Sequence, residues 1–381
     1  MPARCFRARM YTLGTRQGAE LVPFLSPIGR QEHYNARSQK GRKGGFMRYL
    51  LAGANILGLV LTLGLTPTPS AAQTAKSAAA REKTWTVPRT PDGKPDLQGV
   101  WNSSILTPFE RPKEVAGKEF FNQKEAEEFI KDELNRVDGD RRDGGGDADV
   151  GRAYNEFWRD RGKLTPDLRT SMITDPSDGR VPSLTPQAQK IVAARRAANR
   201  GHEFDGPENR SLAERCIQVR NAGPPMIPTN YNSNYQIVQS PGYVALLSEQ
   251  IHDVRVIPTN GRAHVPPNMR LISGDSVGHW EGNTLVVETT NFTDRTAFQD
   301  SGEHMKLIER FTRTGPDTLI YEFTVDDPES FTARWTARYP MTKINELIYE
   351  YACHEGNYGL EGSLSGARAG ERAASASRAS K

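Results

Sequence analysis

The chain has 381 residues, of which 36% are hydrophobic and 25% charged, and its formal net charge is +4. Residues 1–72 contribute +8 to that total, with ten Lys or Arg and two Asp or Glu, so the remainder carries −4. Residues 73–381 therefore have no positive surplus to offset nucleic-acid phosphates, and we expect no nucleic-acid partner.

Residues 1–46 are Arg-rich and have no hydrophobic period, which favours a spurious or disordered extension before a true start at Met47. Residues 47–72 then have the form of a secretory signal peptide: a basic start, an apolar run and small residues up to a cleavage point after Ala72. A long export region with a weak twin-arginine pattern is the alternative.

The apolar run over residues 50–65 is shorter than the roughly 20 residues that a spanning helix needs. We therefore expect a periplasmic or secreted protein with no stable membrane span after cleavage, although a retained N-terminal anchor is the alternative. Cys216 and Cys353 remain after cleavage, and an even pair in an oxidising compartment predicts a disulfide. Two free thiols are the alternative.

The rest of the chain is expected to form one domain with flexible ends. Residues 73–95 are a linker, residues 96–366 a single β-rich domain, and residues 367–381 a disordered tail. The domain contains a helical insertion at about residues 113–200, with an amphipathic helix over 113–136 and a second helix that Thr185 caps.

Short β-rich runs separated by turn residues occupy the C-terminal half. They cover residues 235–239, 243–248, 251–257, 277–280, 284–292, 307–313, 318–325, 331–339 and 346–353. This pattern predicts a mainly β fold, an antiparallel meander or a closed barrel, because closure removes exposed edges. A two-sheet sandwich is the alternative.

Four motifs carry a resemblance to a known family. They are residues 95–101 (PDLQGVW), 154–158 (YNEFW), 278–282 (GHWEG) and 351–358 (YACHEGNY). Together they resemble a family of exported proteins of soil and marine bacteria that has no established activity, so the resemblance implies no catalytic residues. Gly99-Val100-Trp101 before a meander is also similar to the start of lipocalin-type barrels.

Four residues are the candidate catalytic groups. His279 has the type of side chain that acts as a general base near neutral pH, with Glu281 in reach if the turn bends. Asp253 and Arg255 share one strand face, with His252 on the other, and could pair inside a barrel to position a ligand. An ordinary surface pair on the solvent side is the alternative. Glu322 completes the set.

Five residues are the candidate substrate-binding groups. Arg310 shares the more polar strand face with Glu322 across a hairpin, either toward an interior or toward water. The others are His252, Trp280, Tyr231 and Asn232, because aromatic faces beside amides suit polyhydroxylated ligands, although an Asn-rich turn has the same composition.

No spacing of metal ligands and no phosphate-binding or dinucleotide motif occurs in the sequence, so we expect no metal and no cofactor. The first functional hypothesis is an exported acid–base enzyme of the hydratase, lyase or isomerase type, acting on a small organic or glycosidic substrate. The alternatives are a periplasmic ligand-binding or carrier protein and an envelope structural or interaction protein. A small-molecule ligand is the expected partner, and the sequence sets no oligomeric state.

Overall fold

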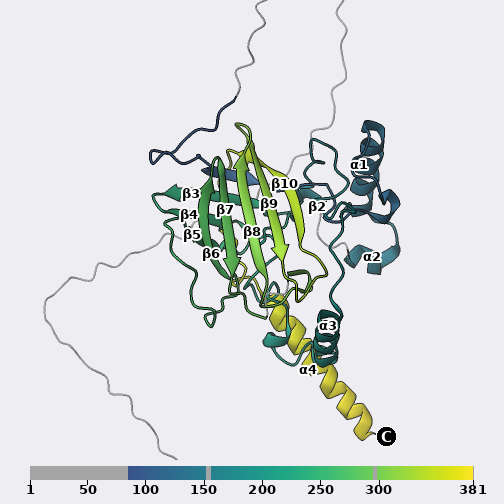
Figure 1. Ribbon diagram of the computed structural model, residues 1–381. Coiled ribbons are helices and arrows are strands. Elements are labelled where there is room, and N and C mark those ends of the chain that lie inside the picture. Colours follow the sequence, from purple (N-terminus) through teal and green to yellow (C-terminus); the bar gives the residue numbers. More distant parts are fainter. Residues whose placement is uncertain (1–84, 152–155, 295–297, 381) are drawn as a thin grey trace, which may run out of the picture. The chain divides into compact units, whose positions relative to one another are not determined.

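The computed structural model describes residues 85–151, 156–294 and 298–380, so the expected extension and signal peptide lie outside the described residues. The protein is mainly β, as expected, with its strands in one antiparallel sheet (Figure 1). The strands are β1 (Gly99–Asn102), β2 (Ile173–Asp175), β3 (Asn234–Ser240), β4 (Tyr243–Ser248), β5 (Val254–Pro258), β6 (Asp275–Glu281), β7 (Thr284–Thr290), β8 (Lys306–Arg313), β9 (Thr318–Asp326) and β10 (Trp335–Ile344).

Two meanders make the sheet, and the first strand of the chain joins them. The order is β5-β4-β3-β1-β10-β9-β8-β7-β6, with β2 paired to β10 beside β1. β1 carries the PDLQGVW motif into the core, where Leu97 and Trp101 are fully buried. The indole Nε1 of Trp101 donates to the carbonyl oxygen of Leu97 at 2.8 Å, so the motif is a structural anchor between the meanders.

Strict alternation of side chains builds the core on one face of the sheet. Every second residue of β8 and β9 is buried, among them Phe311 and Phe323 with no exposed surface. Such alternation is what a sheet with one buried face requires, because successive side chains point to opposite faces. Burying a side chain of this size stabilises the fold by about 1.5–3 kcal/mol.

The hydrogen-bonded ladder ends at β5 on one side and at β6 on the other, so the sheet is a meander and not a closed barrel. The two edges still approach each other. A Cβ on Gly278 would lie 2.9 Å from Cγ2 of Ile257 and 3.1 Å from Cγ2 of Thr259. The glycine that opens the GHWEG motif thus allows β6 to pack against β5 without hydrogen bonds between them.

Helices lie in the insertion and at the C-terminus. They are α1 (Gln123–Val137), α2 (Gly145–Gly151), α3 (Pro186–Asn199) and α4 (Tyr358–Ala379), with short 3-10 turns at η1 (Lys113–Val115), η2 (Glu156–Trp158), η3 (Pro207–Asn209), η4 (Gln250–His252) and η5 (Phe298–Asp300). Asn122 and Glu125 form a capping box at the start of α1, and Thr185 caps α3 ahead of Pro186 as expected.

Several sequence expectations differ from the structure. The helix expected over residues 113–136 begins only at Gln123, and the strand expected over 331–339 lies at Trp335–Ile344. The tail from residue 367, expected to be disordered, continues α4, whose Ala- and Arg-rich composition has high helix propensity. Residues 346–353, expected to be a strand, form no regular element, and Leu347 and Tyr349 stay more than 70% exposed. The strand expected from Ile251 begins at Val254, because η4 takes the preceding residues.

No helix in the described part of the chain combines the length and apolar character that a membrane crossing would need.

Candidate ligand-binding site

The expected disulfide joins Cys216 to Cys353. Residues 217–233, which we call the interior loop, run from this disulfide into β3. Met226 and Ile227 of the interior loop are buried among the core residues of the sheet. The amide of Met226 donates to the Tyr321 hydroxyl at 3.1 Å, and its carbonyl oxygen accepts from the Tyr339 hydroxyl at 2.7 Å. Two buried tyrosines of the strands therefore hold the main chain of the interior loop, one as acceptor and one as donor.

A buried ion pair lies beside this attachment. Arg255 contacts Glu309 through two bonds, Nη1 to Oε2 at 2.6 Å and Nη2 to Oε1 at 2.9 Å. The Tyr321 hydroxyl donates to the same carboxylate at 2.7 Å. Burial opposes the charge on Arg255, but the carboxylate outweighs it and holds the guanidinium pKa above its ordinary value. Of the two arrangements open to Arg255, the structure has the inward one, and its partner is Glu309 and not Asp253.

The buried tyrosines of the interior are neutral groups. Burial raises the pKa of Tyr321 and of Tyr339 far above the ordinary value of a phenol, and burial raises that of Tyr235 as well. The Tyr235 hydroxyl donates to the carbonyl oxygen of Asn221 at 2.6 Å. Tyr235 and Tyr339 fix the interior loop by donating hydrogen bonds to its carbonyl oxygens, whereas Tyr321 accepts one from the Met226 amide. At neutral pH these protonated phenols do not act as bases.

Three of the candidate residues lie on the outer face of the sheet. The Glu281 carboxylate accepts from Arg310 Nη2 at 2.7 Å and contacts His279 Nε2 at 3.1 Å. No bend is needed for this contact, because residues two apart in a strand share a face. Arg310 holds the pKa of Glu281 below its ordinary value, with a smaller effect from His279. Glu322 lies directly opposite Arg310 in the ladder, on the same outer face.

The remaining candidates are dispersed. His252 lies in η4, not in the strand, and its Nδ1 contacts the carbonyl oxygen of Tyr351 at 2.9 Å. The carbonyl oxygen of Asp253 accepts from the Ser248 amide at 2.9 Å. Trp280 packs against the core. The acid–base candidates thus do not line one pocket, because Arg255 lies in the interior, whereas His279 and Glu322 face outward.

Tyr231 and Asn232 form the turn that ends the interior loop. Asn232 has a φ of 49°, a left-handed conformation that asparagine tolerates better than most residues. Its carbonyl oxygen accepts from Asn221 Nδ2 at 2.9 Å, and the carbonyl oxygen of Tyr231 accepts from the Thr229 hydroxyl at 2.8 Å. Asn232 therefore contributes to the turn, one residue after Tyr231 and two after the wall of the cavity described below.

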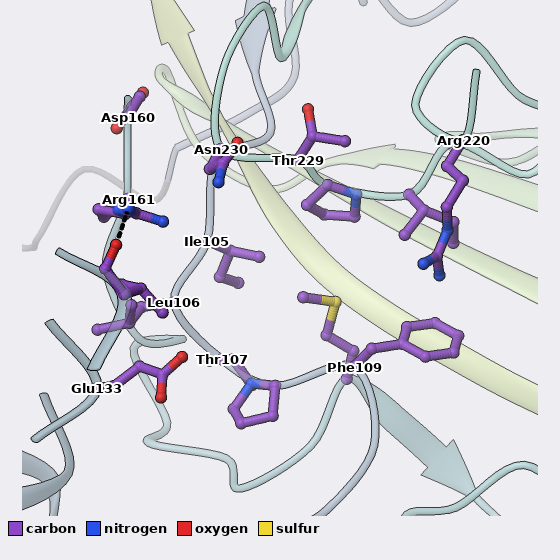
Figure 2. A pocket seen from close by; sticks show the side chains of 15 residues that line it. Ile105, Leu106, Thr107, Phe109, Glu133, Asp160, Arg161, Arg220, Thr229 and Asn230 are labelled. Carbon is purple, nitrogen blue, oxygen red and sulfur yellow. Dashed lines mark hydrogen bonds between the residues drawn. The ribbon is translucent and has the colours of Figure 1, made fainter. Parts of the chain in front are cut away.

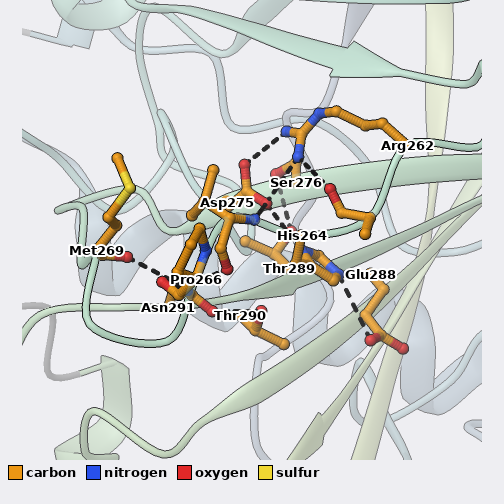
Figure 3. Close-up of polar contacts among 12 residues, drawn as sticks. Arg262, His264, Pro266, Met269, Asp275, Ser276, Glu288, Thr289, Thr290 and Asn291 are labelled. Atoms are coloured by element: carbon orange, nitrogen blue, oxygen red, sulfur yellow. Dashed lines mark hydrogen bonds and ion pairs between the residues drawn. The ribbon is translucent and has the colours of Figure 1, made fainter.

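His264, which no sequence motif singled out, is held between two carboxylates (Figure 3). His264 Nδ1 lies 2.9 Å from Asp275 Oδ2, and its Nε2 lies 3.5 Å from Glu288 Oε1. Arg262 binds the same aspartate, Nη2 to Oδ1 at 2.6 Å. Burial opposes the charge on Asp275, but hydrogen bonds from Arg262 and from the Val265 amide hold its pKa below the ordinary value. This cluster ties the loop before β6 to the sheet.

A cavity of about 430 Å³ opens between the interior loop and the helical insertion (Figure 2). Its lining comes from four separate segments: Ile105, Leu106, Thr107, Pro108 and Phe109; Glu133 and Val137 of α1; Asp160, Arg161 and Met172; and Arg220, Ile227, Pro228, Thr229 and Asn230 of the interior loop. Phe109, Met172 and Ile227 supply apolar surface, and the last two are buried core residues. The cavity is thus lined by both apolar and hydrogen-bonding groups.

Most charged side chains of the cavity already form ion pairs or hydrogen bonds within the protein. Arg161 forms two bonds to Glu156, Nε to Oε1 at 2.7 Å and Nη2 to Oε2 at 2.8 Å. Glu133 is paired with Arg136 of the same helix. Arg220 differs, because its exposed guanidinium has no hydrogen bond or ion pair to any of the described residues.

This cavity could not be predicted from the sequence, because its walls come from loops far apart in the chain. The run of tyrosines and asparagines at residues 231–235 was the nearest signal, since it directly follows Thr229 and Asn230. No periodic pattern pointed to Phe109 or Arg220.

Within the described ranges, no three His, Cys, Asp or Glu side chains are grouped so as to hold a metal ion. No protein-family model matches the chain, and no curated protein or solved structure is significantly similar to it.

Proposed function

We propose that the protein is an exported ligand-binding or carrier protein that holds a small amphipathic molecule in the cavity of Figure 2. The cavity carries this proposal. Its volume of about 430 Å³ is within the range of small-molecule sites, which are mostly apolar with a few placed polar groups. Phe109 and Met172 offer the apolar surface, and Arg220 offers hydrogen-bond donors that have no partner among the described residues.

Export is supported by two observations. The Cys216–Cys353 disulfide suits an oxidising compartment, and residues 47–72 have the composition of a signal peptide. The disulfide also fixes the start of the interior loop, which forms one wall of the cavity. A wall held in place binds a ligand at a lower entropic cost than a wall that has to be ordered first.

Binding is favoured over acid–base catalysis by the placement of the candidate residues. General acid–base chemistry needs the acid and the base within hydrogen-bond reach of one substrate. Arg255 and Glu309 neutralise each other in the interior, while His279 lies on the outer face with its side chain 61% exposed.

Native mass spectrometry of gently purified protein tests the proposal. We expect an added mass that is lost on denaturation, and we expect Ile105→Trp to abolish it by filling the cavity. Val238→Trp is the matched control, because Val238 lies half-exposed on β3, outside the cavity lining. Equal occupancy in both variants contradicts the proposal. So does an empty wild type that no amphipathic compound in a thermal-shift panel stabilises, since a bound ligand at 100 times its Kd contributes about 2.7 kcal/mol.

A further inference from the structure

We infer that the ligand is an amphipathic organic anion whose charged group, a carboxylate or sulfonate, is bound by Arg220. This inference rests on the proposed function and adds the chemical class of the ligand. Its basis is the state of Arg220, a cation that lines the cavity and is left unneutralised by the described residues.

The other charges of the cavity do not compete for this role. Arg161 is neutralised by Glu156, and Glu133 by Arg136. Asp160 accepts from Asn102 Nδ2 at 3.2 Å and from the Gly162 amide at 3.0 Å. In Figure 2, Asp160 and Arg161 lie on one side of the cavity and Arg220 on the other, so the region near Arg220 is positive.

The main chain at Arg220 is held in place. Its carbonyl oxygen accepts from the Ile227 amide at 3.1 Å. The next residue, Asn221, is fully buried, and its carbonyl oxygen accepts from the Tyr235 hydroxyl at 2.6 Å. The interior loop therefore presents the base of the arginine side chain from a fixed position, which lowers the entropic cost of binding.

A guanidinium is suited to bind an oxyanion, because its planar donors match two oxygens at once. The buried surfaces of Met172 and Ile227 lie in the same cavity and suit an apolar body attached to that anion. Arg220 also lines a second cavity of about 350 Å³, with Pro224 and Pro225. The anion would thus be held where the two cavities adjoin.

Two dyes of matched shape distinguish the contribution of the anionic group to binding from that of the apolar body. Anilinonaphthalene sulfonate carries one anionic group, and phenylnaphthylamine is its uncharged parent; both fluoresce when they enter apolar surroundings. We expect the wild type to bind both. Arg220→Gln is expected to lower the affinity for the sulfonate dye by about tenfold or more. The affinity for the uncharged dye should stay nearly unchanged, since only a charge-assisted contact is lost.

Arg196→Gln in α3 is the matched control, because it makes the same substitution at an exposed arginine outside the lining of both cavities. It is expected to leave the affinity for the sulfonate dye unchanged. Arg220→Lys, which keeps the charge but loses the planar fork, is expected to retain part of that affinity. Ile105→Trp tests whether the dyes bind in this cavity, because filling the cavity should lower the affinity for both dyes.

The outcomes distinguish the two proposals. The anion assignment is overturned if Arg220→Gln lowers the affinity for both dyes equally, or for neither. The ligand-binding site still stands in that case, provided that Ile105→Trp lowers the affinity for both dyes. If neither dye binds the wild type, or Ile105→Trp affects neither, the cavity is not a ligand site and both proposals fail.

Discussion

Arg255 of β5 and Glu309 of β8 form a two-bonded ion pair inside the sheet, with the Glu309 side chain fully buried. Tyr321 connects this pair to the interior loop, because its hydroxyl donates to Glu309 and accepts from the Met226 amide. The edge strand, the middle of the sheet and the loop beside the cavity are thereby linked. The pair therefore supports the cavity wall and does not line the cavity itself.

Breaking this pair on one side should strongly destabilise the protein. Arg255→Met leaves Glu309 buried without a counter-charge, and we expect the free energy of unfolding to fall by about 3–5 kcal/mol. Urea denaturation followed by circular dichroism measures it. The double variant Arg255→Met with Glu309→Leu should lose less free energy of unfolding than the single variant, because no uncompensated charge remains. A double variant that is less stable than Arg255→Met argues against this account.

The disulfide should contribute substantially to stability. Removing a native disulfide of a secreted domain typically lowers the free energy of unfolding by about 2–5 kcal/mol. We expect Cys216→Ser with Cys353→Ser to show this loss, and we expect reductant to lower the stability of the wild type but not of the double variant. Urea denaturation with and without reductant gives both values. Equal sensitivity of the two proteins to reductant would show that the bond is not formed.

Gly278 is predicted to tolerate no side chain. In Gly278→Ala the new Cβ would meet the Cγ2 atoms of Ile257 and Thr259 at 2.9 and 3.1 Å, so β5 and β6 must move apart. Overpacking of this kind costs about 1–3 kcal/mol. Gly362→Ala in α4 is the control, because no atom lies within 4 Å of the new Cβ and alanine favours helix. Thermal unfolding should show a lower Tm for the first variant only.

The cluster around Asp275 should make stability depend on pH in the acid range. Arg262, His264 and the Val265 amide face its carboxylate, and the net effect lowers its pKa in the folded protein. The stabilisation is therefore present above the ordinary aspartate pKa and is lost as the pH falls through the lower, folded value. Urea midpoints measured across this range should fall with pH more steeply in the wild type than in Asp275→Asn. Parallel curves contradict the prediction.

The outer-face residues should not matter for ligand binding. We expect His279→Ala and Glu322→Gln to leave the affinities for both dyes within about twofold, since surface substitutions remote from a site have small effects. Fluorescence titration checks this, with Ile105→Trp as the positive control. A loss of binding in His279→Ala would place the functional site on the outer face instead.

The sequence by itself was sufficient for features that depend on neighbouring residues. Alternation over residues 307–313 predicted β8, and Thr185 ahead of Pro186 predicted the start of α3. The pairing of Cys216 with Cys353 also followed, because only two cysteines remained after the expected cleavage. The helical tail was missed because residues 358–379 bury no side chain, so no hydrophobic period marked the helix.

Tertiary structure decided which face is inside and which residues meet. A period of two shows that Arg310 and Glu322 lie on one kind of face, but it does not show that this face is the outer one. The partner of Arg255 was settled by the curvature of the sheet, which brings β5 across to β8. Arg220 and Phe109 enter one cavity only because loops more than 100 residues apart in the chain pack together, and local sequence carries no signal for such contacts.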